Sequence, residues 1–408
     1  MKIFAACTLP WLHSPGKHGT SMRILHIIDT LDPAAGGPSE SVRRILASYA
    51  AMGHHGEVVT LNDPAAPFLR ELDFTVHALG PVGTTYGANP RLIPWLRANR
   101  QRFDGAVVHG LWTFTGYATW KSFADKLPYV VFPHGMLDPY FKRASRLKHM
   151  KKWVYWLAAQ YWILQGAHRV LFTAKAEARL AEQSFWLHSW KPIVVPYGAS
   201  GPTGDAESYR SAFFAHCPAV AGKPYLLYLS RIHPKKGCDL LIDAFAQIAV
   251  SAPGLHLVMA GPDQVGWVPE LQARAAAAGI ADRVHWPGML RGDLKWGAYF
   301  GCEAFVLPSH QENFGIVVAE ALACGKPALL ADKVNIAEDI QAAGAALVEP
   351  DTAEGTLNLL RAWFRTPLAE RERMASNAIS CFRAHYDMRE NAKAIIRIFE
   401  EITQEAPR

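Results

Sequence analysis

Two basic residues near the middle of the chain, Arg231 and Lys236, are typical of a site that binds a diphosphate. Arg231 directly follows an apolar run, Tyr225–Ser230, and Lys236 precedes Gly237 and an apolar helical pattern. An arginine side chain can bind two phosphate oxygens at once, and a lysine adds a compact positive charge. Ordinary surface cations are the alternative, so the pair indicates a diphosphate site only together with its surroundings.

A second candidate site lies between the apolar run Ala304–Pro308 and a helix that we expect to begin near Phe314. The free N–H groups and the positive dipole end of such a helix favour a bound phosphate. Glu312 lies in the loop before this helix, and Glu320 lies inside it among valine, alanine and leucine residues. Because a buried carboxylate needs a partner such as a ribose diol, Glu320 is a candidate nucleoside ligand. A partly exposed helical glutamate is the alternative.

A glycine pair, Gly36 and Gly37, follows the first predicted strand and precedes a helix expected near Ser39. Glycines at this place let backbone N–H groups approach a ligand, although such a pair can also mark a simple turn. The chain has no G-x-G-x-x-G spacing, which argues against a dehydrogenase, and no G-x-x-x-x-G-K-[ST] motif, which excludes a P-loop nucleotide hydrolase.

The elements that must position these residues alternate between short apolar strands and amphipathic helices, as in parallel sheets covered by helices. The expected strands are Ile24–Ile28, Glu57–Thr60, Gly105–His109, Tyr129–Pro133, Arg169–Thr173, Ile193–Pro196, Tyr225–Ser230, His256–Ala260, Val284–Trp286, Ala304–Pro308, Pro327–Ala331 and Ala346–Val348. We therefore predict two doubly wound α/β halves, whose ligands bind outside the carboxyl ends of the strands.

Composition and charge suggest where the halves divide. We predict an N-terminal extension over 1–22, a first domain over 23–199, a second domain over 200–384 and a C-terminal helix over 385–408. The stretch from Gly198 to Tyr209 is rich in glycine and small polar residues, which indicates a linker. The first half carries the excess of basic residues and the second half is acidic. Met22 directly precedes the first strand and is a possible translation start.

In combination, these motifs resemble the retaining GT-B glycosyltransferases of family four, also called group one. The residues that carry the resemblance are Arg231, Lys236-Gly237, Glu312-Asn313-Phe314-Gly315 and Glu320. The resemblance runs from about residue 23 to residue 400 and implies an α/β fold of the GT-B type, with two Rossmann-like domains that face a central cleft. The run from His134 to Pro139, with the tryptophan- and lysine-rich helix after it, is similar to members that build bacterial polysaccharides.

The resemblance also implies residue roles. Arg231 and Lys236 would bind the diphosphate of a nucleotide sugar, Glu312 the hydroxyls of the transferred sugar, and Glu320 the ribose. His134 would lie against the reacting sugar. The catalytic residues would be His134, Glu312, Arg231 and Lys236. The donor-binding residues would be Gly36, Gly37, Arg231, Lys236, Met289, Leu290, Asn313, Phe314, Gly315 and Glu320, with Met289 and Leu290 bordering the base.

Acceptor-binding residues are expected in the first domain, and they are His109, Trp112, His134 and Asp138. His109 and Trp112 follow a predicted strand and offer an aromatic surface for a sugar ring. A buried core position is the favoured alternative for Trp112, since aromatic residues are common in cores. For His134 a core position is also an alternative, but its place directly after a strand favours the site.

Composition limits the class of protein further. With 50% hydrophobic and 19% charged residues, the chain is a globular protein with no apolar run long enough to span a bilayer. Six widely spaced cysteines predict a reducing cytosol and no zinc site. Basic and aromatic residues concentrate over 142–162, which fits either a helix on anionic lipid or a solvated helix that runs into the core. A nucleic acid is not an expected partner, because the second half is acidic.

We therefore expect a metal-independent, hexosyl-type glycosyltransferase that takes a nucleotide diphosphate sugar and acts with retention. The expected acceptor is a lipid-linked saccharide in exopolysaccharide, capsule or O-antigen synthesis, at the inner face of the cytoplasmic membrane. Two alternatives stay open at this point. One is a non-catalytic GT-B partner in a polysaccharide assembly complex, and the other is a sugar-nucleotide epimerase.

Overall fold

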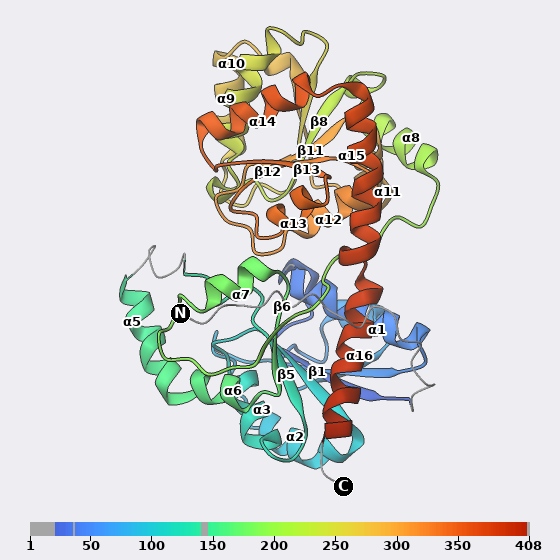
Figure 1. Cartoon of the computed structure of the whole chain (residues 1–408). Coiled ribbons are helices and arrows are strands. Elements are labelled where there is room, and N and C mark those ends of the chain that lie inside the picture. The colour runs from blue at the N-terminus through green and yellow to red at the C-terminus, as the bar shows by residue number, and fades with distance from the viewer. Residues whose placement is uncertain (1–20, 36, 140–145, 406–408) are drawn as a thin grey trace.

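The chain folds into two α/β lobes, which lie one above the other in Figure 1. The structure is a computed structural model that describes residues 21–35, 37–139 and 146–405. Residues 1–20 of the predicted extension lie outside the described residues, and so do Gly36 and residues 140–145.

The first lobe is built on a parallel sheet of seven strands in the order β3-β2-β1-β4-β5-β6-β7. Its strands are β1 Arg23–Ile28, β2 His55–Thr60, β3 Thr75–Ala78, β4 Gly105–His109, β5 Tyr129–Phe132, β6 Arg169–Phe172 and β7 Pro192–Val194. Every residue of β4 and β5 is buried, because helices cover both faces of a parallel sheet. The order changes direction beside β1, and at such a point ligands bind in doubly wound folds.

The second lobe is built on a parallel sheet of six strands in the order β10-β9-β8-β11-β12-β13. Its strands are β8 Tyr225–Leu229, β9 His256–Ala260, β10 Val284–Gly288, β11 Ala304–Leu307, β12 Ala328–Ala331 and β13 Ala346–Glu349. The central strands β8 and β11 are adjacent and fully buried. The loops that follow them therefore leave the sheet side by side.

Helices connect the strands and cover the sheets. The first lobe holds α1 Gly37–Ala51, α2 Leu92–Asn99, α3 Phe114–Phe123, α5 Arg146–Tyr155, α6 Tyr161–Gly166 and α7 Lys175–Ala181. The second holds α8 Ala206–His216, α9 Cys238–Ala249, α10 Val268–Ala277, α11 Gly292–Gly301, α12 Ile316–Ala323, α13 Ala337–Ala342, α14 Ala353–Arg365 and α15 Leu368–Cys381. In Figure 1, α9, α10 and α14 lie on one side of the second sheet, and α8, α11 and α15 lie on the other. No helix among the described residues is long and apolar enough to cross a membrane.

The last helix, α16 Met388–Glu405, returns to the first lobe and packs against α1. The two places where the chain passes between the lobes are bonded to each other. The Ala199 amide donates to the carbonyl of Tyr386 at 3.0 Å, and the Met388 amide donates to the carbonyl of Ala199 at 3.2 Å. A Cβ atom on Gly198 would lie 1.7 Å from the carbonyl oxygen of Tyr386, so only glycine fits there.

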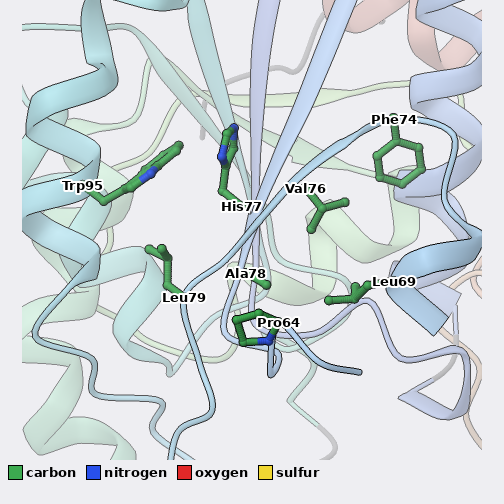
Figure 2. Close-up of a pocket in the computed structure, with 8 residues that line it drawn as sticks. All are labelled: Pro64, Leu69, Phe74, Val76, His77, Ala78, Leu79 and Trp95. Atoms are coloured by element: carbon green, nitrogen blue, oxygen red, sulfur yellow. The ribbon is translucent and has the colours of Figure 1, made fainter. Parts of the chain in front are cut away.

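The expected strands are present, but the sequence analysis missed β3. This strand lies at the edge of the first sheet, and its four residues are exposed or half-buried, so it has no apolar run. Figure 2 shows the hollow beside it, with Trp95, His77 and Leu79 on one side of the segment and Val76 and Leu69 on the other. Two helix starts also differ from expectation: α1 begins at Gly37 and α12 begins at Ile316.

Candidate active site

Lys236 lies at the carboxyl end of β8, in a short 3₁₀ turn over Pro234–Lys236 that precedes α9. The turn ends at Gly237, which has a φ of 66°. A Cβ atom there would lie 2.2 Å from the carbonyl oxygen of Pro308, so glycine permits the loops after β8 and β11 to touch. The Ser309 hydroxyl and the His310 amide donate to the carbonyl of Lys235 at 3.0 and 2.9 Å and bond these two loops together.

The two loops bring Lys236 and Glu312 into an ion pair. The side chains of Lys236 and Glu312 are 7% and 19% exposed, so both charges have lost most of their water. The backbone of Glu312 is held on both sides: its amide donates to the carbonyl of Lys333 at 3.1 Å, and its carbonyl accepts from the amide of Asn335 at 3.1 Å. A fixed carboxylate beside a fixed ammonium can bind a hydroxyl and a phosphate at neighbouring positions.

Arg231, the other predicted cation, lies two residues after the end of β8 and is exposed. Its guanidinium donates to the side-chain carbonyl of Gln264 at 3.0 Å. The Tyr228 hydroxyl donates to the main-chain carbonyl of Arg231 at 2.8 Å and so fixes the backbone at this position. The side chain of Arg231 is thus at the same sheet edge as Lys236 but is directed to solvent and Gln264.

Gly315 is the residue that opens helix α12, with a φ of 78°. A side chain at this position would be strained and would meet the Glu312 side chain at 3.1 Å. The preceding residue, Phe314, is buried against Tyr197 of the first lobe, with ring centroids 5.0 Å apart. The first turn of α12 therefore begins beside Glu312 and at the contact between the lobes.

Glu320 is buried inside α12, and its partner is a lysine that the sequence analysis missed. The Lys295 ammonium on α11 lies 2.6 Å from one carboxylate oxygen of Glu320, and the Tyr299 hydroxyl donates to the other at 3.3 Å. The charge of Glu320 is thus compensated within the protein, and a ribose would be an additional partner. Of the two residues expected at the base, Met289 is 53% exposed, whereas the side chain of Leu290 is buried.

From the first lobe, Gly37 and the segment around Gly135 contact the same region. A Cβ atom on Gly37 would lie 3.3 Å from the side chain of Ile316, the first residue of α12. Gly135 has a φ of 74°, and a Cβ atom on it would lie 2.6 Å from the side chain of Asn313. The lobes therefore meet where glycine backbones of the first lobe contact the first residue of α12 and the loop before it.

The buried carboxylate of Glu177 holds this segment in place. It accepts from the Gly135 amide, the Thr173 amide and the Thr173 hydroxyl, each at 2.7 Å. Burial raises the pKa of Glu177, and the hydrogen bonds from Thr173 and Gly135 oppose that shift. The Asn313 side chain donates to the Thr173 hydroxyl at 3.5 Å and extends the network to the second lobe.

His134 lies two residues after the end of β5, has a φ of 49° and is half-buried. Its ring lies 5.9 Å from that of Tyr197, which also contacts Phe314. The contact between the lobes thus brings His134 and Gly37 of the first lobe near Asn313, Phe314 and Gly315 of the second. Glu312 lies in the same loop as Asn313 and Phe314, and Lys236 forms an ion pair with it.

The predicted acceptor residues are placed differently from one another. His109 is 3% exposed, and both of its ring nitrogens lie within hydrogen-bond distance of other histidines, so its side chain lies behind His134 and does not form an open surface. The expectation that His109 offers an aromatic surface together with Trp112 is therefore corrected, because the His109 ring is buried. Trp112 is half-buried among aromatic rings, and the Lys152 ammonium lies 4.6 Å from its ring centroid. Asp138 is half-buried four residues after His134.

A hollow of about 330 Å³ lies at the carboxyl ends of β1 and β2, and the sequence analysis did not predict it. Its lining combines carboxylate, amide and hydroxyl groups and includes no lysine or arginine. The lining residues are Asp29, Thr30, Leu61, Asn62, Asp63, Pro81, Val82, Thr84, Thr85 and Gly87. Burial raises the pKa of Asp29, and hydrogen bonds from Thr115 and Thr113 oppose that shift.

The described part of the basic and aromatic segment forms α5, a π-helical turn over 156–160, and α6. One face is buried through Trp156, Ile163 and Leu164. The other face exposes apolar side chains, with Val154 71% exposed and Leu157 53% exposed. The buried face agrees with a helix that runs into the core, and contact of the exposed face with lipid stays a prediction.

The architecture defines the class of protein first. Two parallel sheets of seven and six strands, covered by helices and joined by a returning C-terminal helix, form the GT-B fold. Anabaena HepE, solved in complex with UDP and glucose, is similar in fold, with a TM-score of 0.69 and 20% identity over 94% of this chain and 98% of that chain.

Sequence comparison then gives the family. Residues 212–380 match the profile described as glycosyl transferases group 1, and residues 36–198 match that of the glycosyl transferase 4-like domain. The chain belongs to the group 1 glycosyltransferase family.

Two curated relatives illustrate the range of the family around this chain. D-inositol 3-phosphate glycosyltransferase of Segniliparus rotundus is 31% identical over 176 residues, which cover 41% of this chain and 38% of that protein. Alpha-D-kanosaminyltransferase of Streptomyces kanamyceticus is 29% identical over 334 residues, 76% of this chain and 81% of that protein. The chain thus matches about two fifths of the length of the inositol phosphate enzymes.

Proposed function

We propose that this protein transfers a hexosyl group from a nucleotide diphosphate sugar to a hydroxyl of a saccharide acceptor, with retention and without a metal ion. The observation that carries the proposal is the ion pair of Lys236 and Glu312 beside the start of α12, in the loop that contacts Gly135 of the other lobe, the residue after His134. The relatives named above are transferases of sugars, and HepE binds UDP and glucose.

The proposed chemistry follows from the charges. The diphosphate gains negative charge as its bond to the sugar breaks, and fixed positive groups lower the energy of that state. Lys236 and the first turn of α12 are such groups, and Arg231 joins them when its side chain turns from Gln264 to the phosphate. Glu312 accepts hydrogen bonds from the hydroxyls of the transferred sugar, and Glu320, held by Lys295, accepts from the ribose.

The acceptor binds over the carboxyl edge of the first sheet, where Trp112, Asp138 and His134 are its proposed contacts. The polar hollow at Asp29 and Asn62 supports a saccharide there, because its lining suits neutral hydroxyls and would repel a phosphate. The exposed apolar face of α5 and α6 and the neighbouring lysines support a lipid-linked acceptor and contact with the inner membrane face, in synthesis of exopolysaccharide, capsule or O-antigen.

The donor is tested first, with a thermal-shift screen of UDP, GDP and ADP and their sugar conjugates. A ligand at 100 times its Kd adds about 2.7 kcal/mol of stability. We expect a selective rise with one nucleotide, and a smaller one in Lys236→Met. No rise with any nucleotide contradicts the proposal and favours a non-catalytic partner. Conversion of the donor with no acceptor, to an epimer or to free sugar, favours an epimerase or hydrolase instead.

Membrane contact is tested by sedimentation with vesicles of phosphatidylglycerol and phosphatidylcholine. We expect the protein to bind, and Leu157→Glu to bind less, because Leu157 lies on the exposed face of the segment and is 53% exposed. Leu368→Glu is the matched control, since Leu368 is 71% exposed on α15 of the other lobe. Equal binding of both variants, or no binding of the unmodified protein, argues against this surface.

A further inference from the structure

Four side chains form a hydrogen-bonded series that ends at His134. The Tyr49 hydroxyl lies 3.4 Å from Nε2 of His26. Nδ1 of His26 lies 2.9 Å from Nε2 of His109, and Nδ1 of His109 lies 3.0 Å from Nε2 of His134. The three imidazole rings lie edge to edge, with neighbouring ring centroids 5.2 and 5.3 Å apart and neighbouring planes inclined by only 20° and 14°.

The histidines of this series are neutral. Burial lowers the pKa of His26 to about 3 and that of His134 to about 4. Burial also lowers the pKa of His109 well below its ordinary value, and the neighbouring histidines add to this shift. A neutral imidazole carries one N–H and one lone pair, so each histidine can donate through only one of its nitrogens.

The orientation of the series is set at its other end. Tyr49 is fully buried, and among the described residues its hydroxyl has His26 as its hydrogen-bond partner. A buried hydroxyl that fails to donate costs about 1–3 kcal/mol, so Tyr49 donates to Nε2 of His26. His26 must then carry its hydrogen on Nδ1 and donate to His109, which in turn carries its hydrogen on Nδ1 and donates to Nε2 of His134.

We propose that Tyr49, His26 and His109 are positioning residues that hold His134 in the tautomer with hydrogen on Nδ1. Nδ1 of His134 has no hydrogen-bond partner in the described part of the chain and diverges from Nε2, which faces His109. His134 therefore presents an N–H donor to an oxygen of the bound ligand, a sugar hydroxyl or a phosphate, and does not remove a proton. The tautomer follows from the protein alone, and only the nature of the ligand rests on the proposed function.

The experiment is long-range ¹H–¹⁵N NMR of histidine-labelled protein without substrate, which reports which ring nitrogen carries the hydrogen. His134→Gln identifies the signals of His134. We expect hydrogen on Nδ1 in the unmodified protein. In Tyr49→Phe nothing orients the series, so we expect hydrogen on Nε2 of His134 in a substantial fraction of molecules. Tyr129→Phe is the matched control: Tyr129 is also buried, but its hydroxyl donates to the carbonyl of Ile163, and His134 should not change.

Two results overturn the inference. One is hydrogen on Nε2 of His134 in the unmodified protein, and the other is an unchanged His134 spectrum in folded Tyr49→Phe. The first needs no variant, so the inference stays testable if Tyr49→Phe fails to fold. Neither result depends on turnover, and a protein with no transferase activity can still give the expected spectrum. Failure of the proposed function and failure of this inference are therefore distinguishable.

Discussion

Replacing Lys236 by methionine removes the positive charge but keeps most of the side-chain volume. The partner, Glu312, is then left with little water and no cation beside it, since its side chain is 19% exposed. Removing one member of a buried ion pair costs about 3–5 kcal/mol. Because Glu312 keeps a fifth of its surface in contact with solvent, we expect a loss of about 3 kcal/mol in the free energy of unfolding. We also expect a 10²- to 10³-fold loss of turnover, typical of removing one group that stabilises developing charge.

A double variant separates the two effects. In Lys236→Met/Glu312→Gln no charge stays buried, so the free energy of unfolding should return to within about 1 kcal/mol of the unmodified protein, while turnover stays low. Urea denaturation and donor consumption measure the two quantities. Arg210→Met is the matched control, because its ion pair with Glu207 is exposed and should contribute less than about 1 kcal/mol. A single variant Lys236→Met that is as stable as the unmodified protein would falsify the claim that the pair is desolvated, and near-normal turnover in either variant would refute the diphosphate role.

Three further predictions follow from the same geometry. Lys295→Met should lower the free energy of unfolding by about 3–5 kcal/mol, measured by urea denaturation, because Glu320 stays buried without its cation. Lys295→Arg keeps the charge and should retain most of this stability. Equal losses in the two variants would contradict the pairing. Gly135→Ala should lower the free energy of unfolding more than Gly279→Ala. Both glycines have a positive φ, but only a Cβ atom at position 135 would meet Asn313. Equal losses would show that the contact between the lobes is loose. Burial lowers the pKa of His26 to about 3 and that of His134 to about 4, so below pH 6.5 the unfolded chain takes up protons that the folded chain does not. The free energy of unfolding should therefore be highest above pH 6.5 and fall below it by up to about 1.4 kcal/mol per pH unit for each histidine. Urea denaturation that gives the same free energy of unfolding from pH 7.5 to pH 5 would contradict this.

The sequence predicted those parts of the fold in which burial leaves a clear pattern. Strands such as β4 and β5 are mostly apolar because helices cover both faces; β4 was predicted with its exact bounds and β5 one residue too long. The edge strand β3 is half-exposed and has no such pattern. The domain limits at residues 199 and 384 stay predictions.

The candidate site could be predicted in part for a related reason. Lys236 and Glu312 were recognised because each follows a buried strand, and the adjacency of β8 and β11 then brings their loops together. Lys295 gave no signal, because its partner lies 25 positions away on another helix. His26 and His109 were visible as polar residues in apolar strands, but their contact depends on β1 lying beside β4, which the sequence does not reveal. The roles assigned to the site residues stay predictions.

The bonded crossings at Ala199 and Asp387 have a mechanical consequence for the whole molecule. Both covalent connections pass through one point, so this point is the pivot for any rotation of one lobe against the other. Tyr386 at the pivot lies 5.7 Å from the ring of Phe314, which in turn packs on Tyr197 beside His134. Because these rings lie close to the pivot, a rotation that moves the distant rims of the lobes by a large distance moves the rings only slightly. A rotation about this point would therefore change the spacing of the rims far more than the geometry around His134 and Phe314.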